Sequence, residues 1–355
     1  MMKRFGMLLL IEFKLAAATI PFHLVAILQP SLMFVLMAAI LVNPTFEMNV
    51  AEPQNEAQQD YVDAMLQVGS PIGEAYIDPT YHKPEAIGSG TLGQVIVFEE
   101  RNKSNFVVQQ FSLIDSNMVK NYRNRQTAAG LILWNQQLGA LAVDIQESPW
   151  LPVDMPYTIY FSMALLPMAT CIAGALVGGV LTAHDFEFNT IFEYRLAPVS
   201  TALMLSVRIV RAALTALISA TILLIISMLY MGFVPRGIGA IYLILLPMAL
   251  IASCLGIAAA LIFRKTIPAF VIGLAATFGF WIMGSGFGLA GGFSGLYEQI
   301  SRFIPNTYAV ELLFPHYYGT QLHVPSLASM TLVFMCLLML ALVTILYTMR
   351  VRRRV

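Results

Sequence analysis

Six long apolar segments alternate with more polar ones along the chain, and each is long enough to cross a lipid bilayer. A bilayer-spanning helix needs about 20 mostly apolar residues. The segments that meet this length are 20–42, 157–182, 212–231, 238–263, 267–290 and 326–349. Two of the connections are so short that the helices they join must run antiparallel. The pattern predicts an all-α membrane protein built as a bundle of six transmembrane helices.

One sizeable polar block, residues 43–156, separates the first span from the second. Its acidic residues outnumber its basic residues by 14 to 6, which gives the block a net charge of −8. The stretches QVIVFE at 94–99 and FVVQQFSL at 106–113 are rich in Val and Phe and predict β-strands. The block therefore reads as a small domain with its own core, placed outside the membrane.

The rest of this block predicts a mixture of helix, strand and loop. Asp115 or Ser116 can cap a helix that runs through 117–139. Residues 143–145 predict a further short strand, whereas 51–90 has weak periodicity and reads as partly loop. The expected fold of the block is thus a small inserted α/β domain.

Two further segments predict helices that do not cross the bilayer. Residues 1–19 mix charged positions, among them Glu12 and Lys14, with apolar ones, as in a helix that lies along the inner membrane surface. The alternative is a frayed first turn of the first span, but Pro21 favours a break there. Residues 291–325 carry apolar side chains at helical spacing and predict short re-entrant outer helices. The chain then divides into 1–42 (interfacial helix and first span), 43–156 (outer domain) and 157–355 (five-span bundle).

Composition supports a membrane protein and excludes several other classes. Hydrophobic residues make up 58% of the chain and charged residues only 11%, with a mean hydropathy of +0.74. About a quarter of the residues are charged in a typical soluble domain. The net charge of zero gives no electrostatic case for nucleic acid. His and Cys residues show no metal-ligand spacing, so no metal site is expected.

Lys and Arg residues set the expected orientation in the membrane. They gather at the N-terminus, in 183–211, in 264–266 and at the C-terminus, and this places all four regions in the cytoplasm. Both termini are then cytoplasmic and 43–156 is extracytoplasmic. Arg208 and Arg211 fall just before a segment that already spans the bilayer. We expect both to sit at the inner interface and extend toward water, the alternative being buried functional charges.

The sequence contains partial matches to nucleotide-binding and serine-protease motifs. The stretch GSGTLG at 88–93 matches a dinucleotide-binding pattern in letters only, because a strand follows it where a helix is needed. The chain contains no P-loop motif. The stretch GFSG at 292–295 resembles the Gly-x-Ser-Gly of rhomboid intramembrane proteases, but the last span has no His to activate Ser294. No catalytic residue is therefore assigned.

Glycine pairs at a spacing of four allow helix backbones to approach closely. Gly174 and Gly178 form such a pair in the second span, and Gly284 and Gly288 form another at the end of the fifth. The sequence does not distinguish three roles for these glycines: packing inside the bundle, a subunit interface, or the wall of a substrate pathway.

A compact charged and aromatic segment, HDFEFNTIFEYRLAPVS at 184–200, follows the second span. Its four aromatic side chains within nine residues are unusual for a solvated loop and suit a short helix that docks onto another protein. Pro198 would end that helix before the third span.

The layout of the whole chain resembles the permease subunits of type-2 ABC exporters. Members carry an interfacial helix with an acidic-basic step, here Glu12 and Lys14, and a first span containing a proline, here Pro30. After the second span they have an acidic segment ending in Thr and then a proline before the third span. This chain reads DFEFNT at 185–190 and then Pro198, with Asn189 at the usual Gly, and Asn tolerates the same left-handed backbone. PNTY at 305–308 resembles a further family step in the outer loop.

The resemblance implies a specific function. Segment 184–198 would be the coupling helix, seated on a separate ATP-binding cassette ATPase that binds ATP and Mg, while this chain binds no cofactor. Two permease copies and two ATPases would form an exporter in the plasma membrane of a prokaryote. Its apolar spans suit a lipid-like or amphipathic substrate. The acidic outer domain would receive substrate, bind an envelope protein or cover the exit. Six residues would transmit force or shape the coupling helix: Asp185, Glu187, Thr190, Glu193, Arg195 and Pro198.

Two other classes stay open beside the exporter. The first is a six-span intramembrane serine protease, which a serine-directed probe on Ser294 would reveal. The second is an ion-coupled transporter that needs no ATPase. Such transporters usually carry acidic residues within their spans, and the six predicted segments contain none.

Overall fold

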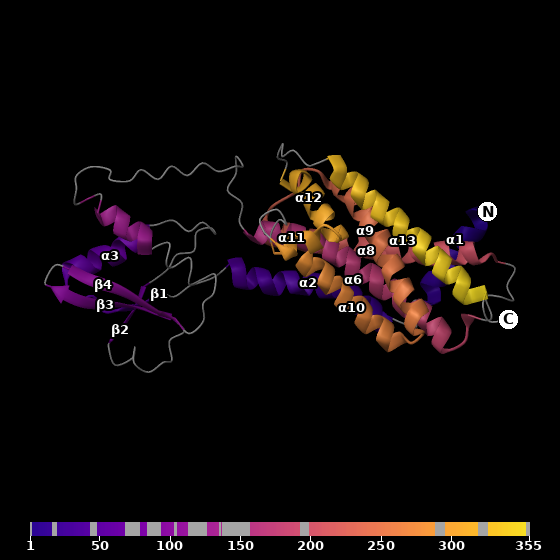
Figure 1. The fold of residues 1–355 in the computed structure, drawn as a ribbon, viewed down its shortest axis with the longest axis horizontal. Coiled ribbons are helices and arrows are strands. Elements are labelled where there is room, and N and C mark those ends of the chain that lie inside the picture. Colours follow the sequence, from indigo (N-terminus) through magenta and orange to yellow (C-terminus); the bar gives the residue numbers. More distant parts are fainter. Residues whose placement is uncertain are drawn as a thin grey trace. The chain divides into compact units, whose positions relative to one another are not determined.

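A computed structural model describes the fold of most of the chain (Figure 1). Its described residues are 2–15, 20–42, 48–67, 79–83, 94–102, 105–112, 126–134, 136, 157–191, 199–287, 295–318 and 326–352. The chain divides into two compact units, which we take in turn. One contains Met1–Ala39 and Tyr157–Val355, and the other contains Ile40–Pro156.

The first unit is a bundle of helices. In chain order they are α1 (Met2–Leu15), α2 (Ile20–Val42), α6 (Tyr157–Glu187), α8 (Thr201–Met231), α9 (Ile238–Phe263), α10 (Thr266–Met283), α11 (Leu296–Ser301), α12 (Pro305–Tyr318) and α13 (Ser326–Arg352). Among the described residues six helices are long and apolar enough to span a membrane, namely α2, α6, α8, α9, α10 and α13. The predicted six-helix fold class is confirmed, and both α11 and α12 fall within residues 291–325, where short helices were predicted.

Three helix ends differ from the prediction, each for a physical reason. Helix α6 continues to Glu187 and α8 already begins at Thr201, because charged residues at these ends find partners within the bundle. Ser200 caps α8 with its side-chain oxygen, which accepts a hydrogen bond from the Leu203 N–H at 3.3 Å. Helix α10 stops at Met283, before a turn in which Ser285 has a φ of 70°.

Helix α6 lies among the other helices of the bundle and packs against α8, α9, α10 and α12 (Figure 1). It is 94% buried over its most apolar window, compared with 17% for α13. Small residues make this possible at the contact with α9. A Cβ added at Gly256 of α9 would collide with the backbone of Ala175 of α6. The backbones of α6 and α9 are therefore in direct contact.

Hydrogen bonds tie the short helices α11 and α12 to this bundle. The hydroxyl groups of Ser162 on α6 and Tyr317 on α12 lie 2.7 Å apart in the buried interior. Asn306 donates to the carbonyl of Gly284, just past the end of α10. These contacts fix α12 against the same end of α6 and α10.

The second unit contains a mixed four-stranded sheet. Its strands are β1 (Met48–Ala51), β2 (Pro79–His82), β3 (Gln94–Asn102) and β4 (Asn105–Ser112), in the order β2-β1-β3-β4. β1 pairs in parallel with β2 and β3, and β3 pairs antiparallel with β4. This sheet and its helices confirm the predicted α/β fold.

Among the described residues of this unit two helices accompany the sheet, α3 (Glu56–Gln67) and a helix at 126–134. The hydrophobic core of this unit joins β1, β3, α3 and the helix at 126–134. Its buried residues include Val50, Ile96, Val62, Met65 and Ala129. Burial raises the pKa of Tyr61 to about 12. The predicted strand at 143–145 and the 88–93 stretch lie outside the described residues.

Candidate functional site

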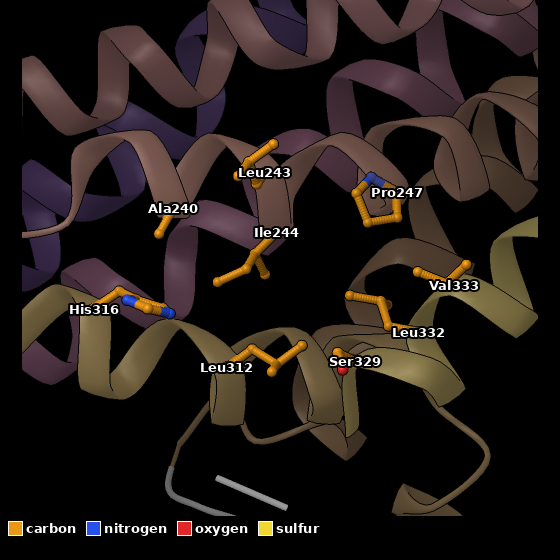
Figure 2. Close-up of a pocket in the computed structure, with 9 residues that line it drawn as sticks. All are labelled: Ala240, Leu243, Ile244, Pro247, Leu312, His316, Ser329, Leu332 and Val333. Carbon is orange, nitrogen blue, oxygen red and sulfur yellow. The ribbon is translucent and has the colours of Figure 1, made fainter. Parts of the chain in front are cut away.

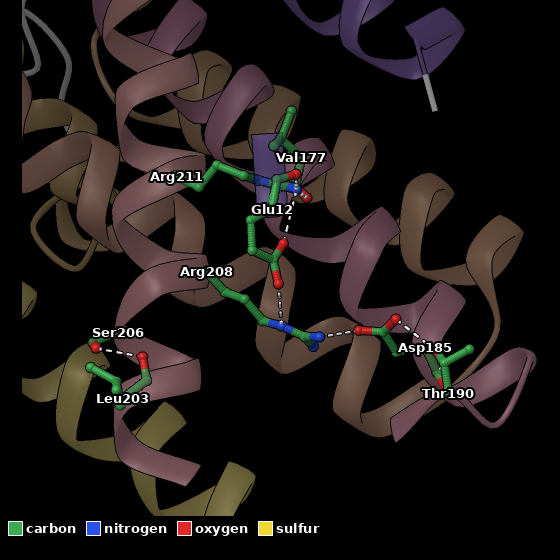
Figure 3. Close-up of polar contacts among 8 residues, drawn as sticks. All are labelled: Glu12, Val177, Asp185, Thr190, Leu203, Ser206, Arg208 and Arg211. Carbon is green, nitrogen blue, oxygen red and sulfur yellow. Dashed lines mark hydrogen bonds and ion pairs between the residues drawn. The ribbon is translucent and has the colours of Figure 1, made fainter. Parts of the chain in front are cut away.

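Four charged side chains from three helices form a buried cluster at one end of the bundle (Figure 3). Arg208 of α8 places Nε 3.4 Å from Oε1 of Glu12 on α1, and its Nη2 contacts Oδ2 of Asp185 on α6. Arg211, one turn further along α8, places Nη1 3.2 Å from Oε2 of Glu12. We call Glu12, Asp185, Arg208 and Arg211 the charge cluster. It links α1, α6 and α8.

The charge cluster is electrically balanced and mostly shielded from solvent, with only the Asp185 side chain partly exposed, at 13%. Glu12, Arg208 and Arg211 expose only 4%, 3% and 2% of their surface. Buried charges are costly unless each has a partner of opposite sign and hydrogen bonds for its remaining groups. The two carboxylates balance the two guanidinium groups. Arg211 also donates to two backbone carbonyls, those of Glu12 and Val177, each at 3.2 Å.

This finding corrects the expectation that Arg208 and Arg211 extend toward water. Both side chains point into the bundle because Glu12 and Asp185 supply counter-charges there. The spacing of three residues places both arginines on one face of α8. That spacing, together with two acidic residues at the same expected membrane depth, was the sequence signal for the cluster.

The residues after α6 form a tight turn anchored to the charge cluster. Asn189 adopts a left-handed backbone with a φ of 59°, as expected for the position where the resembled family has Gly. Thr190 Oγ1 donates to Oδ1 of Asp185 at 2.9 Å, so Asp185 lies between Thr190 and Arg208 (Figure 3). Ile191 is buried among apolar residues of α8, α9 and α13. The turn is therefore held by both polar and apolar contacts.

Glu187 makes a separate connection from the end of α6 to α10. Its Oε2 accepts a hydrogen bond from the backbone N–H of Thr266, the first residue of α10, at 2.9 Å. The first N–H groups of a helix have no partner within the helix, and a carboxylate there satisfies one and complements the helix dipole. Glu187 is otherwise exposed, which leaves its second oxygen accessible to a partner.

The structure therefore brings together some of the predicted site residues and not others. Asp185, Thr190 and Glu12 belong to one connected set, and Glu187 joins it through α6. Lys14 on α1 is exposed and lies outside the charge cluster. The remaining predicted residues lie outside the described residues: Glu193, Arg195, Pro198, Gly288 and Ser294.

The described glycines of the predicted set serve packing within the chain. Cβ atoms added at Gly174 and Gly178 would lie 2.9 Å from Ala252 Cβ and 2.8 Å from the Ser253 carbonyl, both on α9. A Cβ at Gly284 would meet Asn306 and Ile304 beside α12. Of the three readings left open by the sequence, packing inside the bundle fits these glycines.

The chain matches no family model, and no curated protein and no solved structure is significantly similar to it. Its six apolar helices define it as a multi-pass membrane protein.

The turn after α6 gives a first test. Asn189→Gly should preserve the turn because Gly adopts a positive φ without strain. Asn189→Val should strain it by about 1–2 kcal/mol, which would speed trypsin cleavage after Arg195 by about tenfold through local opening. The measurement is limited proteolysis of the purified full chain. Equal cleavage rates for the two variants would contradict the left-handed turn.

Proposed function

We propose that this chain is the permease subunit of an ATP-driven exporter of the type-2 ABC kind. The observation that carries the proposal is the connectivity of the α6 terminus. Arg208 joins Asp185 of α6 to Glu12 of α1, and Glu187 joins α6 to the first turn of α10. A force applied to the acidic and aromatic segment 184–198 would reach α1, α6, α8 and α10 together.

The proposed mechanism uses this connectivity. A separate ATPase subunit seats on 184–198 from the cytoplasm and holds ATP and Mg. ATP binding closes a pair of such ATPases, which pushes on the segments of two permease copies. Because the paired charges resist separation in a buried site, α1 and α8 follow α6 instead of sliding past it. Each bundle then moves against its partner copy and opens the substrate pathway.

The proposal also fixes orientation and substrate class. The charge cluster faces the cytoplasm together with both termini, and the unit at 40–156 lies outside. The membrane is the plasma membrane of a prokaryote. Polar side chains within the spans are few and are mostly bonded to backbone carbonyls, as at Thr170, Ser253 and Thr277. Spans of this composition suit a lipid-like or amphipathic substrate better than an ion.

Glu187 allows the docking role to be separated from the capping of α10. Glu187→Gln keeps an oxygen that can accept from Thr266 but removes the charge, whereas Glu187→Arg reverses the charge and removes the cap. If the charge contacts the ATPase, both variants should weaken association, with Arg the more severe by about tenfold or more. The measurement is the amount of ATPase that co-purifies with each variant.

The control for this prediction is stability. Glu187→Gln keeps the hydrogen bond to Thr266 and should lose only the interaction with the helix dipole, so it should unfold close to the temperature of the unchanged protein. If the Arg variant alone loses the ATPase and also unfolds earlier, Glu187 acts only as a cap. If neither variant loses the ATPase, segment 184–198 is not the coupling element.

The experiment that tests the proposed function itself is affinity purification of the chain from its native cells in mild detergent. We expect an ATP-hydrolysing subunit in equal amount. If the chain is recovered alone, the exporter proposal fails. A serine-directed probe on Ser294 and ion-gradient transport assays would then test the two other classes.

A further inference from the structure

The structure contains a pocket on the flank of the bundle that the charge cluster and the coupling segment do not involve (Figure 2). It has a volume of ≈ 290 Å³ and lies between α9, α12 and α13. Seven of its nine lining residues are apolar. The lining residues are Ala240, Leu243, Ile244, Pro247, Leu312, His316, Ser329, Leu332 and Val333.

One end of the pocket carries His316, and the other end is mainly apolar, with the exposed Ser329 beside Leu332 (Figure 2). His316 lies near Ala240, whereas Pro247 and Val333 lie at the opposite end (Figure 2). Pro247 lies seven positions after Ala240 on α9, which corresponds to about 10 Å along the helix. The carbonyl of His316 accepts a hydrogen bond from the Gly237 N–H at 2.9 Å, and this fixes His316 at the start of α9. The backbone of His316 is therefore fixed there, and its imidazole lines one end of the pocket.

The surroundings of the pocket decide what can fill it. Helices α9 and α13 are both long and apolar enough to span a bilayer, so the solvent at their outward faces is hydrocarbon. Leu243 and Val333 are 73% and 51% exposed, which opens the pocket to that hydrocarbon. An apolar space of this kind does not hold ordered water, because water needs two to four polar partners. An acyl chain would pack against the apolar walls, and a head group would accept a hydrogen bond from His316.

We propose that this pocket binds one acyl chain of a membrane phospholipid, with the phosphate of the head group accepting a hydrogen bond from the imidazole of His316. The chain runs past Leu312 and Ile244 toward Pro247 and Val333. The site lies on the side of α9 and α13, so it holds a lipid whether or not the protein is an exporter.

The test uses the full-length protein in vesicles of phosphatidylethanolamine and phosphatidylglycerol that contain a phospholipid with a photoreactive diazirine in its acyl chain. Labelled peptides are identified by mass spectrometry. We expect labelling to concentrate on 240–247 and 329–333. Val333→Trp fills the apolar end and should reduce this labelling about tenfold. Leu337→Trp, one turn further along α13 and also exposed, should leave it unchanged.

A second variant tests the polar end. His316→Phe keeps an aromatic ring but removes the hydrogen bond, and should reduce labelling about fivefold. Equal labelling of the unchanged protein and the Val333→Trp variant would overturn the proposal, as would even labelling along the exposed faces of α9 and α13. So would efficient cross-linking of Val333→Cys between two copies of the chain, because a second protein chain would then fill the pocket.

Discussion

Arg208→Met is expected to destabilise the protein by about 3–5 kcal/mol, because it leaves the largely buried carboxylate of Asp185 without its charged partner and the buried Glu12 with Arg211 alone. Arg208 is the only member of the charge cluster for which contacts with both acidic residues are described. Without it, Glu12 and Asp185 keep two negative charges against the single positive charge of Arg211. The measurement is thermal unfolding of the purified full chain in detergent, followed by the fluorescence of its tryptophans.

Two matched variants make this result specific. Asp185→Asn added to Arg208→Met restores charge balance and should recover at least half of the lost stability. Arg302→Met removes an ion pair with Glu298 that is largely exposed, with side-chain exposures of 69% and 39%. Such a pair contributes about 0–1 kcal/mol. If Arg208→Met costs no more than Arg302→Met, the charge cluster is not buried in the membrane-embedded protein.

The same variants bear on the proposed function. If the proposal holds, an uncoupled transporter would keep its ATPase partner but lose transport, because the ATPase would contact 184–198 and not Arg208 itself. The double variant with Arg208→Met and Asp185→Asn is expected to fold but lacks the link between α6 and α8. We therefore expect it to bind the ATPase and to fail in coupling. Because Asp185 lies within 184–198 but bonds to Arg208 and Thr190, Asp185→Asn alone is the docking control and should also keep the ATPase. This outcome separates transmission of force from docking.

The sequence predicted the helices well where a single physical signal dominates. Length and hydropathy alone located all six spans, because a bilayer leaves few alternatives for twenty consecutive apolar residues. Their ends were less predictable. The start of α8 at Thr201 depends on partners for Arg208 and Arg211, and these partners come from α1 and α6, far away in the chain.

The outer unit shows a similar limit. β3 and β4 are adjacent in the chain, long and rich in Val and Phe, so local pattern identified both. β1 and β2 have only four residues each and pair in parallel across an intervening helix. Four residues carry too little periodicity to predict a strand, and parallel pairing leaves no hairpin signal.

At the candidate site, sequence reasoning found the residues that are close along the chain. Asp185, Asn189 and Thr190 form one turn, so a local pattern described them. The contact of Glu187 with Thr266 joins positions 79 residues apart. Nothing in a single sequence predicts this contact, because it depends on how α6 and α10 are packed.

The second prediction with a large effect concerns the contact of α6 with α9. Gly256→Ala is expected to destabilise the protein by about 3 kcal/mol or prevent folding, because the added Cβ would overlap the backbone of Ala175. A side chain could rotate away, but backbone can yield only if the two helices separate. The measurement is the monodisperse fraction in size-exclusion chromatography together with the unfolding temperature.

Gly239→Ala on the same helix is the matched control, because no atom lies within 4 Å of a Cβ at that position. Removing a glycine from a helix normally stabilises it by up to about 1 kcal/mol, so the two substitutions should have opposite signs. Equal effects would mean that α6 and α9 are further apart than described. Opposite signs would support a rigid α6–α9 pair. A displacement of the α6 terminus would then move α9 as well, together with the α9 wall of the proposed lipid pocket, because no flexible contact between the two helices would absorb the displacement.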